Sequence, residues 1–267
     1  MKLYLKVVFV FVFETFELLR TNVNDIYYIN LDYNFLSRLF IMINFYDKLP
    51  KDIKQETKLD KDFKNHHILP NSMIAIIGGT GSGKSNALCN LISKQSNKYY
   101  DIIIFNPVST DEPLLKLLKQ KMPELKLISD IEELPSLSEF VGDSEHEKLI
   151  VFDDVINMST KDFKKVKEYF TGGRKLGFTV VIMAQNYVSI PKTIVRNCQY
   201  FFIFKLNDNV TINNIIRNHN IYNVEKDTVR KFYDDATSKP LNFFLVDLKT
   251  KDKETHLRKN FDEFFKV

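Results

Sequence analysis

From residue 68 onward, short unbroken apolar runs alternate with segments in which apolar residues recur every three or four positions. Unbroken runs predict strands buried on both faces, whereas the three-to-four spacing predicts amphipathic helices. The predicted strands are 73–77, 99–105, 125–128, 148–152, 178–184, 200–206 and 243–247, and the predicted helices are 86–92, 114–119, 131–140, 161–170, 210–218 and 226–234. This alternation predicts an α/β fold with a mostly parallel central sheet covered by helices on both faces.

The first part of the chain follows a different pattern. Residues 1–46 are rich in apolar side chains, and the run 7–13 follows two lysines, as the apolar part of a signal peptide would. However, the first alanine of the chain is Ala75, so no small-residue cleavage site follows, and two glutamates end the run before it could span a membrane. We expect neither secretion nor a membrane span. Two alternatives stay open: a structural strand, or a dispensable extension upstream of a start at Met42.

The chain is expected to consist of four segments. An apolar extension, 1–46, is followed by a lysine- and aspartate-rich stretch, 47–67, whose lack of periodicity predicts a solvated linker. The alternating strands and helices all lie in 68–250, which we interpret as one domain. The remaining residues, 251–267, are interpreted as a charged C-terminal tail.

Composition and charge change this picture only slightly. Hydrophobic residues make up 44% and charged residues 27% of the 267 positions, which is typical of a globular protein. The formal net charge of +4 permits a nucleic-acid partner without requiring one. Cys89 and Cys198 lie in apolar runs, and the five histidines show no metal-ligand spacing. We therefore expect the reduced core cysteines of an intracellular protein.

One short glycine-rich segment carries the strongest chemical signal. Between the predicted strand 73–77 and the predicted helix 86–92, the sequence GGTGSGKS fits the P-loop pattern at every constrained position. Such a loop turns backbone N–H groups toward an anion at a helix N-terminus, where the macrodipole favours negative charge. The residues expected to hold ATP are Gly78, Gly79, Thr80, Gly81, Ser82, Gly83, Lys84, Ser85 and Asn86.

A second acidic element is expected to complete the ATP and Mg²⁺ site. Lys84 would neutralise the β- and γ-phosphates, and the hydroxyl of Ser85 would bind Mg²⁺. The predicted strand 148–152 leads into Asp153 and Asp154, which has the shape of a Walker B element. We expect Asp153 to hold Mg²⁺, directly or through water, and Asp154 to accept a proton from the attacking water.

A glutamine follows the predicted strand 178–184. Gln185 would lie beside the phosphates if this strand neighbours the Walker B strand, and a glutamine there can orient the attacking water. The alternative is a polar residue that simply leaves the sheet.

The segment 174–185, together with 190–197 and the strand that begins at Tyr200, resembles the FtsK–HerA superfamily of DNA-pumping ATPases. Within it, the chain is similar to the genome-packaging ATPases of poxviruses, of other large eukaryotic DNA viruses and of related mobile elements. The resemblance implies a RecA-like core, assembly as a homo-oligomeric ring, double-stranded DNA as the moved substrate, and an arginine finger acting across subunits. Arg174 is the candidate finger and Arg196 the reserve. Many superfamily members carry glutamate where this chain has Asp154.

The leading hypothesis is therefore a DNA-translocating ATPase that packages a viral or virus-like genome. Capsid or portal components would be further partners, and the host cytoplasm, a viral factory or the virion would be its location. Two alternatives stay open: a nucleotide or nucleoside kinase, and an ATP-gated assembly scaffold that does not depend on turnover. The stretch between the P-loop and Walker B shows no acceptor pocket or arginine-bearing lid of a kinase, and the intact Lys84, Ser85, Asp153 and Asp154 argue against the scaffold.

Overall fold

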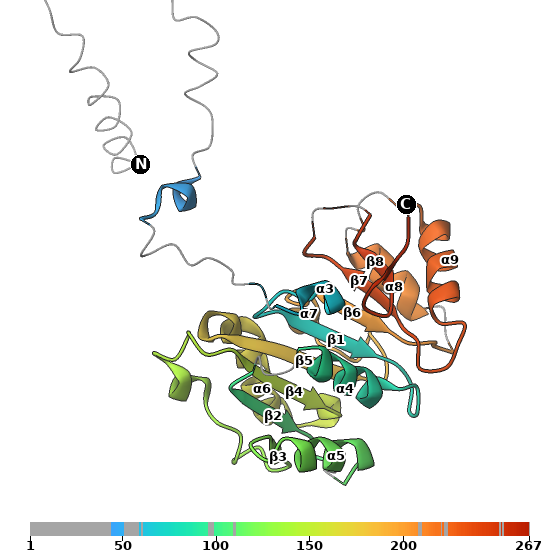
Figure 1. Ribbon diagram of the computed structural model, residues 1–267. Coiled ribbons are helices and arrows are strands. Elements are labelled where there is room, and N and C mark those ends of the chain that lie inside the picture. Colours follow the sequence, from blue (N-terminus) through green and yellow to red (C-terminus); the bar gives the residue numbers. More distant parts are fainter. Residues whose placement is uncertain are drawn as a thin grey trace, which may run out of the picture. The chain divides into compact units, whose positions relative to one another are not determined.

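A nine-stranded mixed sheet forms the centre of the computed structural model (Figure 1). The structure describes residues 44–50, 59, 61–95, 99–108, 111–207, 210–219, 221, 224–250, 252 and 254–266. The chain divides into two compact units, 1–56 and 57–267, and the second contains the sheet. The first unit contributes a described 3-10 helix, Phe45–Lys48. The interpretations of the run 7–13 and of a start at Met42 fall outside the described residues.

The strands follow the order β3-β2-β4-β5-β1-β6-β7-β8-β9. Their bounds are β1 Met73–Ile77, β2 Asp101–Phe105, β3 Lys126–Ile128, β4 Lys148–Asp153, β5 Phe178–Ala184, β6 Tyr200–Ile203, β7 Phe244–Asp247, β8 Leu257–Lys259 and β9 Glu263–Phe264. All pairings from β3 to β6 in this order are parallel, and those from β6 to β9 are antiparallel. The predicted α/β fold with a mostly parallel sheet is confirmed.

Helices cover both faces of the sheet because alternate residues of each strand point to opposite sides. The helices are α3 Phe63–His66, α4 Lys84–Lys94, α5 Pro113–Lys121, α6 Thr160–Gly172, α7 Lys192–Val195, α8 Val210–Asn218 and α9 Lys226–Ala236. Ala75 and Ile77 of β1 pack in one buried cluster with side chains of α6 to α9. Ile74 and Ile76 pack in the other, with α4 and α5. Within the described part of the chain, no helix combines the length and hydropathy needed to cross a membrane.

The segment 131–140, predicted as a single helix, is instead a turn followed by the 3-10 helix Leu137–Phe140. Pro135 has no N–H to donate, and Ser136 begins a new capping box. The hydroxyl of Tyr169 in α6 donates to the carbonyl of Pro135 at 2.8 Å. The helix prediction is wrong because a proline and a tertiary hydrogen bond override the apolar spacing.

The segment 251–267, predicted as a charged tail, contributes strands β8 and β9 to the sheet. Arg258 is only 1% exposed, since its guanidinium pairs with Asp247 of β7 and donates to the backbone carbonyl of His66 at 3.2 Å. His66 is itself fully buried in α3, although the sequence analysis assigned it to a solvated linker, 47–67. Both interpretations are wrong for these residues. Pairing with Asp247 allows the charge of Arg258 to be buried, and the buried Nδ1 of His66 accepts a hydrogen bond from the N–H of Ile68 at 3.0 Å.

Candidate functional site

The loop between β1 and α4 has a shape that requires glycine. Gly81 and Gly83 have φ of 74° and 107°, in the left-handed region that side chains with a Cβ rarely adopt. A Cβ on Gly83 would also lie 2.8 Å from Cδ2 of Leu241, and one on Gly78 would lie 2.8 Å from Cβ of Phe204. The strand, the tight loop and the helix that a P-loop needs are therefore all present.

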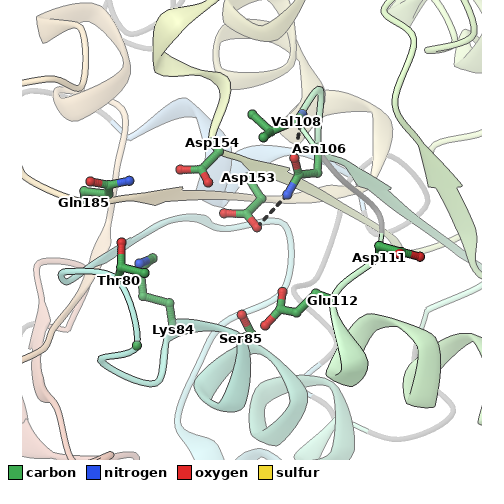
Figure 2. A pocket seen from close by; sticks show the side chains of 11 residues that line it. Thr80, Lys84, Ser85, Asn106, Val108, Asp111, Glu112, Asp153, Asp154 and Gln185 are labelled. Atoms are coloured by element: carbon green, nitrogen blue, oxygen red, sulfur yellow. Dashed lines mark hydrogen bonds between the residues drawn. The ribbon is translucent and has the colours of Figure 1, made fainter.

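A cavity of about 430 Å³ opens at this loop, at the carboxyl ends of β1, β2, β4 and β5 (Figure 2). Its lining residues are Thr80, Gly81, Lys84, Ser85, Asn106, Val108, Asp111, Glu112, Asp153, Asp154 and Gln185. Parallel strands bring their carboxyl ends to the same edge of a sheet, where open α/β folds bind ligands. The predicted lysine, serine, aspartates and glutamine thus converge on a single cavity.

The sheet order explains how Gln185 reaches this cavity. Strand β5 pairs with β4 on one side and with β1 on the other. Gln185, directly after β5, therefore follows a strand between the one that leads to the P-loop and the one that ends at Asp153. Gln185 was expected beside the phosphates if β5 neighbours the Walker B strand, and β5 does pair with that strand, β4.

Lys84 lies inside the loop that it follows. Its Nζ donates to the carbonyl oxygens of Gly78 at 2.8 Å and of Gly79 at 3.1 Å. Burial lowers the pKa of Lys84, while the nearby carboxylates of Asp153 and Asp154 act in the opposite direction. The ammonium group is thus oriented by the backbone of the phosphate-binding loop.

Asp153 is held by a neighbouring strand. The amide Nδ2 of Asn106, which follows β2, donates to Oδ2 of Asp153 at 3.1 Å, and the N–H of Val108 donates to Oδ1 of Asn106 at 2.9 Å. Asp153 is 7% exposed, and burial together with the charge of Asp154 raises its pKa to about 6. The Asn106 amide therefore fixes one carboxylate oxygen of Asp153.

Asp154 occupies an unusual backbone conformation. Its φ is 49°, in the left-handed region, and it directly precedes the 3-10 helix Val155–Asn157. Aspartate and asparagine tolerate this region better than other residues with a side chain. The sharp turn separates Asp154 from the buried Asp153 and leaves its side chain half-buried in the cavity.

The donor set fits Mg²⁺ together with a nucleotide phosphate. Apart from the exposed Asp111, which pairs with Lys116, three carboxylates and one lysine line the cavity, so its charge calls for a cation to accompany any phosphate. Mg²⁺ prefers oxygen ligands and retains several waters. Within the described ranges, no three acidic, thiol or imidazole groups form a ready metal cluster. Mg²⁺ would therefore be held by the hydroxyl of Ser85, by Asp153 and by waters.

The remaining predicted residues lie elsewhere. Gly78, Gly79, Ser82 and Gly83 belong to the backbone of the loop outside the cavity lining, and Asn86 lies in the first turn of α4. The sequence analysis missed the four lining residues that come from the β2–α5 connection: Asn106, Val108, Asp111 and Glu112. Asn106 could have been found from the sequence, because it is a polar residue directly after the predicted strand 99–105.

Neither arginine lies in the cavity. Arg174 is exposed in the 3-10 helix Gly173–Leu176 before β5, and Arg196 is exposed at the end of α7 before β6. Both positions are at the amino edge of the parallel strands. The seven residues of β5 separate Arg174 from Gln185 by roughly 20 Å at about 3.3 Å per residue.

The raised pKa of Asp153 gives a testable prediction for stability. Burial disfavours the charged carboxylate of Asp153 in the folded protein. The stability that the protonated side chain contributes is therefore fully present below pH 4 and is lost as the pH rises through about 6. At pH 8, Asp153→Asn is expected to increase the free energy of unfolding of the nucleotide-free protein by ~2–3 kcal/mol. Urea unfolding of both proteins from pH 4 to 8 measures the difference. A difference that does not widen with pH would contradict the prediction.

Comparison with known proteins assigns the chain to a family. Residues 60–239, more than half of the chain, match the family model described as Poxvirus A32 protein. The chain belongs to this family. This match confirms the resemblance to the poxvirus proteins that the sequence analysis noted.

Two similar viral proteins are each 28% identical to the chain over 160 residues. The DNA packaging protein OPG160 of Vaccinia virus (strain Copenhagen) is 28% identical over 160 residues, covering 55% of the chain and 58% of the relative. The Monkeypox virus protein of the same name is 28% identical over 160 residues, covering 55% of the chain and 52% of the relative. The chain thus matches little more than half the length of these relatives.

Solved structures share the fold of the chain. The genome packaging NTPase B204 from Sulfolobus turreted icosahedral virus 2, in complex with sulfate, has a TM-score of 0.52 at 13% identity and covers 75% of the chain and 100% of that protein. Its complex with ATP-gammaS has a TM-score of 0.50 at 12% identity, with coverages of 72% and 98%. At such low identity the likeness shows the fold alone.

Proposed function

We propose that the chain is an ATPase that uses hydrolysis to move double-stranded DNA into a viral or virus-like capsid. The observation that carries the proposal is the convergence of Lys84, Ser85, Asp153, Asp154 and Gln185 on one cavity at the carboxyl edge of the sheet. The start of α4 and the carboxyl ends of β4 and β5 supply these side chains, and each has the chemistry that a step of phosphoryl transfer to water requires.

The residues divide the work of hydrolysis. Lys84 binds and neutralises the β- and γ-phosphates, and Ser85 and Asp153 hold Mg²⁺, which supplies further positive charge on the phosphate oxygens when bound. Asp154 accepts the proton of the attacking water, and Gln185 orients that water. Asn106 keeps Asp153 in position through its amide.

The direction of the proposal toward DNA comes from the relatives. The Vaccinia virus relative is named a DNA packaging protein, and the structural neighbour with ATP-gammaS is a genome packaging NTPase. We extend this to a homo-oligomeric ring of the chain, with capsid or portal components as further partners. The host cytoplasm, a viral factory or the virion would be its place of action.

Hydrolysis is expected to be stimulated by double-stranded DNA of any sequence. The stimulation should weaken as salt rises, because binding of phosphates releases condensed counterions. The measurement is ATPase rate against duplex concentration at several salt concentrations, with the Lys84→Ala protein as the control for contaminating activity. ATP-dependent displacement of a triplex-forming strand from linear duplex then tests movement.

Two results would contradict the proposal in different ways. Salt-sensitive stimulation without strand displacement would favour an ATP-gated scaffold, and a response to a small phosphate acceptor in place of DNA would favour a kinase.

Lys161 and Lys164 of α6 are candidates for contacting the DNA. Lys165 and Lys167 are less available, since the Nζ of Lys165 donates to a backbone carbonyl and that of Lys167 lies 5.6 Å from the ring centroid of Phe163.

A further inference from the structure

Glu112 is an acid in the cavity to which neither the motifs nor the family match assigns a role. It lies in the connection between β2 and α5, directly before Pro113, the first residue of α5. Among the described residues, the carboxylate of Glu112 makes no hydrogen bond that caps this helix. The side chain lines the cavity and is turned toward Ser85 (Figure 2).

The charge of Glu112 affects the pKa of Asp153 and the pKa of Lys84. After burial and Asp154, it is the next cause that raises the pKa of Asp153. It also counteracts the lowering of the pKa of Lys84 by burial, after Asp153 and Asp154. Coulombic effects of this kind require the groups to lie near one another in a partly desolvated site. The geometry carries the placement: Glu112 lines the same cavity as Ser85, Lys84 and Asp153, and its carboxylate is directed toward Ser85 in Figure 2.

The preceding acid, Asp111, is placed differently although it also borders the cavity. Its carboxylate pairs with Lys116 of α5 at 2.8 Å, and its side chain is 83% exposed. In Figure 2 the Asp111 side chain points away from Ser85, whereas that of Glu112 points toward it. Adjacent acids of the same connection thus offer a test residue and a matched control.

We propose that Glu112 completes the magnesium site as an outer ligand, accepting a hydrogen bond from a metal-bound water on the Ser85 side. This inference rests on the proposed function, since it requires Mg²⁺ to be bound with the nucleotide. Mg²⁺ retains several waters in such sites, and outer carboxylates that bond to them contribute to affinity.

Glu112→Gln is expected to weaken metal affinity while leaving the nucleotide contacts intact. The probe is Mn²⁺ in the presence of ADP, with free Mn²⁺ measured by electron paramagnetic resonance. We expect the affinity for Mn²⁺ to fall ~10-fold in Glu112→Gln, the usual effect of removing an outer-shell partner. Glu112→Asp should recover part of the loss, and Asp111→Asn should bind Mn²⁺ as the wild-type protein does.

Metal-free ADP binding separates the metal role from a structural one. Glu112→Gln should bind ADP without metal as well as the wild-type protein does, or better, because a negative charge has been removed. Unchanged Mn²⁺ affinity, or an equal loss of metal-free ADP binding, would overturn the role of Glu112 and leave the proposed function standing. Failure of the wild-type protein to bind ADP and Mn²⁺ would overturn the proposed function and the inference together.

Discussion

Replacing Asp154 with asparagine is expected to leave ATP bound and to slow hydrolysis by ~10²–10⁴-fold, the usual contribution of a general base. Asparagine suits this position, because it tolerates the left-handed backbone that Asp154 adopts with a φ of 49°. The substitution therefore removes the proton acceptor without disturbing the turn. Lys84→Ala, by contrast, should lose nucleotide binding and turnover together. ATP affinity and kcat of both variants are the quantities to measure.

A second substitution at position 154, which lengthens the acid and keeps its charge, provides the control. Asp154→Glu retains a carboxylate and introduces the residue that many members of the resembled superfamily carry, so it should retain much of the turnover. Normal turnover in Asp154→Asn would show that another group accepts the proton. Loss of ATP binding in Asp154→Asn would show that Asp154 acts on the nucleotide or metal instead.

Arg174→Ala is expected to retain ATP and to lose roughly 10³-fold or more in the rate of hydrolysis. Its place at the amino edge of β5, roughly 20 Å of strand away from Gln185, prevents it from reaching the cavity of its own chain. Burial, together with the charge of Arg174, lowers the pKa of Lys249, so two cations lie close together at this edge. Such a surface is suited to meet the phosphates held by a neighbouring chain.

Mixing experiments identify an arginine that acts across subunits. Rings that combine Arg174→Ala and Lys84→Ala chains should regain some activity, because some interfaces then pair an intact P-loop with an intact arginine. Lys175→Ala is the matched control, since Lys175 is exposed in the same turn and should tolerate the change. Absence of recovery in rings shown to be mixed would point to Arg196, which lies at the same edge.

The strands in the middle of the sheet could be predicted from the sequence almost residue by residue. The predicted strands 73–77 and 178–184 have the same bounds as β1 and β5. Every residue of these strands is buried, so each apolar run begins and ends with the strand itself. Local sequence is sufficient where burial on both faces leaves few polar positions, such as Thr179 in β5.

The C-terminal strands could not be predicted, because their stability depends on distant partners. β8 contains Arg258 and Lys259, and neither apolar alternation nor an unbroken run marks it as a strand. Arg258 is buried only because Asp247 and the carbonyl of His66 receive its N–H groups. A pattern along the chain cannot show an ion pair whose members come from different strands.

The candidate site divides in the same way. The P-loop is a continuous motif, so its place between a strand and a helix could be predicted from the sequence. Asn106 and Glu112 enter the cavity because β2 pairs with β4, and this long-range pairing is not written in any local pattern. Gln185 stands between these cases. The sequence places it directly after a predicted strand, but it reaches the cavity because that strand, β5, pairs with β4.

The cavity lies at the carboxyl edge of the sheet and Arg174 at the amino edge, and this separation bears on how two chains would have to meet for one to complete the cavity of the other. In a two-fold dimer each contact occurs twice, so two chains would complete each other's cavities through one interface that contains both edges. In a closed head-to-tail ring, the two edges belong to two different interfaces. Each chain then gives an arginine to one neighbour and receives one from the other. The two directions around such a ring are therefore inequivalent.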